Sequence, residues 1–147
     1  MNESVKSAIG RKVMSADGAV EVGKVKAFVV DQPPRHITAL HVAGRKRNPE
    51  LVDWSSVSGF GPDAVIIVSE GAMREADEDR EDLMARHKID ILKARVLDTA
   101  GVEHGVVKDA TFDATNGALI EIHTSTDHVV GVESIHSLGS YAIVVQV

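Results

Sequence analysis

The chain repeats its own pattern, and this repeat constrains its fold more than any other feature. Gly23 and Gly105 each stand two positions before a Val-Lys pair and are 82 positions apart. Asp31 and Asp113 have the same separation. The separation then changes once, to 78 positions, which aligns Val52, Trp54, Ser56 and Val57 with Val130, Val132, Ser134 and Ile135. The change falls between residues 43 and 51, and because loops accept changes of length that strands do not, we predict a loop there.

Each copy has the pattern of several short β-strands. Turn signals at Asp17-Gly18 and Asn116-Gly117 predict two hairpins. Apolar runs at 64–68 and 142–145 predict a buried last strand in each copy, and a single helical turn is expected at Trp54. Five or six strands of this length fit a small barrel, which leaves few strand edges unprotected. The sequence therefore predicts a mainly β protein with two small β-barrels.

The segment between the copies has a different character. Residues 71–88 contain no proline and no β-branched residue, and apolar side chains recur near one helical stripe. Acidic side chains supply most of the opposite face. We therefore predict a first barrel at residues 1–70, an acidic linker helix at 71–87 and a second barrel at 88–147. The apolar stripe is expected to pack on a barrel, and a rigid spacer or a partner-binding helix is the alternative.

Composition excludes several classes of protein. The 147 residues carry a net charge of −6, which disfavours nucleic-acid binding because that function needs a strongly basic face. The absence of cysteine removes disulfides, thiol catalysis and zinc–thiolate sites. No run approaches the roughly 18 apolar residues that cross a bilayer, and the first eight residues lack the apolar centre of a signal peptide. We expect a cytoplasmic protein without a transmembrane segment.

No residue pattern predicts catalysis or a metal centre. The seven histidines lack the spacing of a helical metal motif, and His41 and His123 are expected to face solvent. Asp31 and Asp113 end strands before turns, where an aspartate binds its own backbone. Ser55 lies in no nucleophile elbow. We therefore assign no catalytic, cofactor-binding or metal-binding residue, and do not expect an enzyme.

One concentrated run of positive charge stands in the longer loop of the first copy. It consists of Arg45, Lys46 and Arg47. Such a run can bind a phosphate, an acidic partner or anionic lipid, and the acidic linker of another chain is one counterpart. Three adjacent charges in a loop can also simply be solvated. These three residues are the candidate partner-binding site.

The order of these segments resembles the PRC-barrel family, named for the cytoplasmic domain of the photosynthetic reaction centre H subunit. The resemblance rests on the segments at 10–13, 17–18, 22–25, 37–40 and 52–57, and on their counterparts at 95–98, 105–109 and 138–145. It implies one small β-barrel per copy and a tandem arrangement. The family supplies no catalytic motif, and its members act mostly in assembly and interaction, although a related barrel forms part of a ribosome maturation factor.

The resemblance and the composition together lead to one main hypothesis for function. We expect a non-enzymatic adaptor that binds another protein, with the two barrels packed together within a chain or between two chains, because a barrel of about 60 residues is marginally stable alone. A ribosome- or RNA-associated factor that uses the basic loop is the alternative. A small-ligand or metal sensor is a second alternative.

Overall fold

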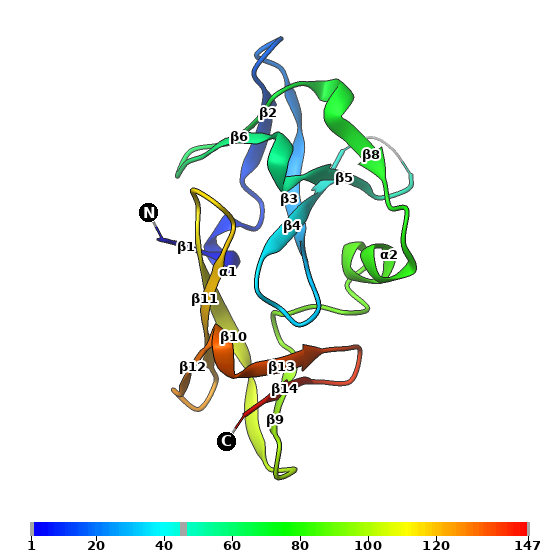
Figure 1. The fold of residues 1–147 in the computed structure, drawn as a ribbon. Coiled ribbons are helices and arrows are strands. Elements are labelled where there is room, and N and C mark those ends of the chain that lie inside the picture. The colour runs from blue at the N-terminus through cyan, green and yellow to red at the C-terminus, as the bar shows by residue number, and fades with distance from the viewer. Residues whose placement is uncertain (1, 45–46, 147) are drawn as a thin grey trace.

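The protein consists of two curved β-sheets stacked end to end, with the first half of the chain above the second in Figure 1. The computed structural model describes residues 2–44 and 47–146. Half of the chain is in strands and few residues are helical, which confirms the predicted mainly β fold with two small barrel-like units.

The first sheet has the order β6-β7-β2-β3-β4-β5-β8. Neighbouring strands are antiparallel except for β2 and β7, which run parallel. A short 3-10 helix, η1 (Trp54–Ser56), stands between β5 and β6 at the position of the predicted helical turn. The strands are β2 (Lys12–Ser15), β3 (Glu21–Val30), β4 (Ile37–Ala43), β5 (Glu50–Asp53), β6 (Val57–Phe60), β7 (Val65–Ile67) and β8 (Met73–Glu75).

The second sheet has the order β12-β11-β10-β9-β14-β13. It repeats the strand order of the first sheet, with a parallel pair, β14 and β9, where the first has β7 and β2. A 3-10 helix, η3 (Val132–Ser134), again precedes the last two strands. The strands are β9 (Arg95–Asp98), β10 (Glu103–Asp113), β11 (Leu119–Thr124), β12 (Val129–Gly131), β13 (Ile135–Leu138) and β14 (Ile143–Val145).

The N-terminal strand leaves its own half and joins the other sheet. Strand β1 (Asn2–Ser4) pairs antiparallel with the far end of β10, so that Asn2 lies opposite Asp113. The short helix α1 (Val5–Ala8) follows and buries Val5 and Ala8. The Asp109 carboxylate accepts hydrogen bonds from the Ser4 hydroxyl and from a backbone N–H of α1. The second sheet is therefore completed by a strand from the start of the chain.

A single apolar core runs through both halves. Its centre is Phe112 of β10, which is fully buried and whose ring lies 5.3 to 6.1 Å from those of Phe28, Trp54 and Phe60. Three of these four aromatics belong to the first half of the chain. Such clusters bury large areas, and tilted or edge-on contacts add to that gain. Aromatic packing therefore holds the halves together.

The linker is less helical than the sequence predicts. Residues 71–87 were expected to form one helix, but the segment divides into the 3-10 helix η2 (Glu70–Ala72), strand β8 and the helix α2 (Asp79–Ala85). Strand β8 pairs with β5 and so supplies partners to an edge that would otherwise be open. The helix then begins at Asp79, where acidic side chains favour a helix N-terminus. Its buried Met84 and Ala85 pack on the first sheet, as predicted for the apolar stripe.

Gly117 forms the turn between β10 and β11 at a place where no side chain fits. Its φ is +76°, and an added Cβ would lie 3.0 Å from two ring atoms of Trp54. We expect Gly117→Ala to lower the free energy of unfolding by about 2–3 kcal/mol, from backbone strain and a clash across the two halves. Gly101→Ala is the matched control, because Gly101 has φ +84° and nothing within 4 Å. It should cost only about 1 kcal/mol. Equal losses in urea denaturation would contradict this account.

Candidate functional site

The candidate residues of the basic loop lie only partly within the structure. Arg45 and Lys46 fall outside the described residues. Arg47 is exposed and lines a small hollow of about 130 Å³ together with His41, Asn48 and Glu50. The role of the loop as a partner site stays a prediction.

A larger hollow lies in the second half of the chain, and we call it the basic groove. It has a volume of about 550 Å³ and is formed by the segment 87–95, which follows α2, by β10 and by the turn between β13 and β14. The residues that give it its character are Lys88, Lys93, Arg95, Val106, Ser140 and Tyr141. A hollow of this size can hold a ligand or a partner segment, and the lining here is more polar than apolar.

Tyr141 gives the basic groove an exposed aromatic side chain. It is 72% exposed, whereas the other four aromatic residues lie in the core cluster. The Arg95 guanidinium carbon stands 5.1 Å from the centre of the Tyr141 ring, and Arg95 Nη1 donates to the Tyr141 hydroxyl over 3.0 Å. The Glu103 carboxylate forms an ion pair with Nε of Arg95 at 3.0 Å. The ring is thus fixed in place while its outer face stays open, as suits a contact residue.

Two lysines of the basic groove have no ion pair within the described residues. These are Lys88 and Lys93, and both are exposed. Asp90, the acidic residue of the groove lining, pairs with His87 at 2.8 Å. His87 and Lys93 both have left-handed backbones, with φ of +61° and +68°. Non-glycine residues rarely adopt this conformation, and it concentrates at functional sites. The groove therefore presents free positive charge from a constrained segment.

Sequence reasoning missed the basic groove, although one signal was present. Four of the 16 lysines and arginines fall within residues 86–95, directly after the acidic stretch. The predicted boundary between the linker helix and the second barrel, at residues 87 and 88, falls inside this cluster. Tyr141 stands beside an apolar strand and gives no sign of exposure. Only the fold brings the turn at 139–142 beside residues 87–95.

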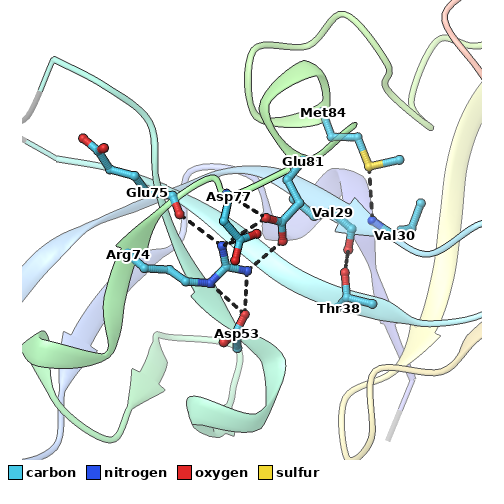
Figure 2. Close-up of polar contacts among 9 residues, drawn as sticks. All are labelled: Val29, Val30, Thr38, Asp53, Arg74, Glu75, Asp77, Glu81 and Met84. Atoms are coloured by element: carbon cyan, nitrogen blue, oxygen red, sulfur yellow. Dashed lines mark hydrogen bonds and ion pairs between the residues drawn. The ribbon is translucent and has the colours of Figure 1, made fainter. Parts of the chain in front are cut away.

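A second polar cluster holds the linker against the first sheet. Arg74 of β8 binds Asp53 through Nη2 at 2.8 Å and Glu81 of α2 through the same nitrogen at 2.7 Å. Figure 2 shows Arg74 at the centre of these carboxylates, with Met84 of α2 reaching the backbone N–H of Val30. The bonds from Arg74 lower the pKa of the Glu81 carboxyl to about 2. One guanidinium thus links β5, the linker and α2, which is typical of a structural contact.

His41 is only partly exposed, although the strand alternation predicts a side chain that faces solvent. Its Nδ1 atom is buried and has no hydrogen-bond partner among the described residues. The segment that includes Ala85 and His87 lies close to the imidazole and removes part of the solvent that the strand position alone would leave around it. Burial lowers the pKa of His41, and the positive charges of His87, Lys26 and Arg86 act in the same direction, against the backbone of Ala85.

The partly buried imidazole of His41 makes the free energy of unfolding depend on pH. Because the native pKa of His41 lies below its ordinary value of 6.5, the unfolded chain binds more protons in mildly acidic solution. The unfolding free energy should therefore fall as the pH drops below about 6.5 and be restored above it. His41→Leu should reduce this slope in urea denaturation series between about pH 5 and 7.5. A slope unchanged by the substitution would contradict the assignment.

The described residues contain neither a candidate metal cluster nor a helix that could cross a membrane. Across residues 2–44 and 47–146, no cluster of three or more His, Asp or Glu side chains is placed to hold a metal ion. In the same part of the chain, no helix combines the length and the apolar character that a bilayer crossing requires. His104 and His128 do lie close, with ring centres 5.9 Å apart, and Asp98 accepts from His104 at 2.7 Å.

The fold defines the class of protein: it is mainly β and consists of two small barrel-like units. The family model for the PRC-barrel domain matches residues 2–72, so this part of the chain is a PRC-barrel domain. The match covers the first sheet up to the start of β8 and includes β1. No curated protein matches the chain.

Proposed function

We propose that the chain is a non-enzymatic assembly module, made of two PRC barrels, that binds another protein through the basic groove. The observation that carries this proposal is the exposed ring of Tyr141 beside a hollow of about 550 Å³. A tyrosine held by Arg95 costs little entropy to bury in a complex, and tyrosine is enriched among the residues that dominate protein interfaces.

The tandem arrangement is part of the proposal. Its support is the strand order, which is the same in both sheets, and the 3-10 helices that occupy the same place in each. The second half, residues 88–147, would then be a diverged barrel whose changed loops form the binding face. This division suits an adaptor, because one barrel supplies a stable scaffold while the other carries the contact.

Site-specific cross-linking tests the proposal. The photoreactive residue p-benzoylphenylalanine replaces Tyr141 in the source cells, and irradiated samples are compared by quantitative mass spectrometry. Val20 is the matched control site, because it is 51% exposed in the turn between β2 and β3, in the other half of the chain. We expect a defined protein, or a second copy of this chain, to be joined at position 141 only. Equal or empty capture at both sites would overturn the proposal.

The same cross-linking experiment tests whether the basic loop is part of the interface. Arg45, Lys46 and Arg47 are replaced by alanine in the chain that carries the cross-linker at position 141. If the loop adds to the interface, capture at position 141 should fall. Unchanged capture would remove the loop from the proposed site and leave the basic groove as the contact. The cytoplasmic location remains a prediction.

A further inference from the structure

We propose that the segment bound in the basic groove is an acidic peptide with an apolar side chain beside its carboxylates. This inference rests on the proposed function and names the chemistry of the partner. The first support is charge. Lys88 and Lys93 present two ammonium groups without ion pairs in the described residues, in a chain whose net charge is −6. Such groups match the spaced, flexible carboxylates of Glu and Asp side chains.

The second support is a more apolar hollow that borders the same segment of the chain, residues 87–93. It has a volume of about 200 Å³ and shares His87, Asp90, Leu92 and Lys93 with the groove. Its other walls include Ile9, Phe28 and Ile91, and Ile9 is 39% exposed. An aliphatic side chain can enter this hollow while neighbouring carboxylates reach the lysines. The two hollows therefore suit one short segment that carries both features.

The surroundings of the groove favour a peptide over a nucleic acid. Asp90 lies in the lining, and Glu103 stands beside Arg95. A regular phosphate backbone would meet both carboxylates, and the overall negative charge would repel a long polyanion. A peptide of a few residues can place its carboxylates at the lysines and keep them away from Asp90 and Glu103. The aromatic ring of Tyr141 then covers the bound segment from one side.

Fluorescence anisotropy with designed peptides tests the inference. The probe is a labelled peptide of eight residues, built of Glu and Asp around one leucine, and its control replaces the acids by Gln and Asn. We expect binding of the acidic peptide only, with affinity falling steeply between about 50 and 300 mM salt. Replacing the leucine of the peptide by serine should weaken binding about tenfold.

Variants of the chain test whether the peptide binds in the basic groove. The double variant Lys88→Glu with Lys93→Glu should weaken binding by about tenfold or more. The matched control is Lys12→Glu with Lys24→Glu, which makes the same change of net charge at exposed positions of β2 and β3. It should leave the affinity within about twofold. Tyr141→Ser should weaken binding, whereas Tyr141→Phe, which keeps the ring, should not.

The outcomes separate this inference from the proposed function. Equal binding of the acidic and the amide peptides, or equal loss in both double variants, would overturn the inference. Tighter binding of a labelled RNA of the same length would overturn it in favour of a nucleic-acid site. If no peptide binds but cross-linking at position 141 still captures a protein, the acidic chemistry is wrong and the proposed function stands. If cross-linking captures nothing, the proposed function itself fails.

Discussion

Replacing Phe112 by alanine should destabilise the protein by about 3–5 kcal/mol, the largest loss we expect from a single substitution. The ring is fully buried and contacts three aromatics of the first half of the chain, so its removal leaves a cavity between the halves. Urea denaturation followed by the fluorescence of Trp54, the only tryptophan, measures this loss.

The same denaturation experiment, applied to the native chain, tests whether the two halves unfold together. In the native chain, circular dichroism and Trp54 fluorescence should give one coincident transition, because the core is continuous. Leu97→Ala is a useful control, since Leu97 is only half-buried and lies on β9, outside the core cluster. A loss for Phe112→Ala no larger than for this control would contradict the role assigned to the aromatic cluster.

Replacing Arg74 by alanine should lower the free energy of unfolding by about 1–3 kcal/mol. The Glu81 side chain is only 14% exposed, and without Arg74 it would keep a charge with little solvent around it. Arg86→Ala is the matched control, because its pair with Asp82 joins the C-cap of α2 to the helix itself and both side chains are more than 40% exposed. The control should change stability by about 0.5 kcal/mol or less.

The Arg74 variant should also change the response to acid. Because the native pKa of Glu81 is about 2, against an ordinary value of 4.5, its pair stabilises the fold fully above about pH 4.5 and loses that effect as the pH falls toward 2. In Arg74→Ala this part of the acid dependence should disappear. Parallel curves of stability against pH for the variant and the parent chain would show that the pair does not act as described.

Local signals in the sequence predicted the local structure. The turn at Gly117 needs a residue that tolerates a positive φ, and the Asn-Gly pair at 116–117 predicts such a turn. The helical turn at Trp54 and the apolar last strands also lie where the sequence places them. These features depend on neighbours in the chain, so a single sequence carries them.

The features that sequence reasoning missed depend on residues far apart in the chain. The sequence of β8 predicts a helix, because this segment becomes a strand only by pairing with the open edge of β5. The polar segment Asn2–Ser4 has no strand pattern of its own and pairs with β10, more than 100 residues away. The sequence predicts an exposed His41 because the approach of Ala85 and His87 to this side chain is a tertiary contact. The basic groove was missed for the same reason, since its two sides come from 87–95 and 139–142.

The pairing of β1 with β10 bears on how the chain is made. At a synthesis rate of about 5–20 residues per second, the partner strand is completed roughly 5–20 s after β1 leaves the ribosome. During that interval the first half has emerged while Phe112, which covers its aromatic side chains, has not. The early chain therefore exposes apolar surface that only its own later residues can cover. Slower translation of residues 73–113 would lengthen this period and favour aggregation or capture by a chaperone.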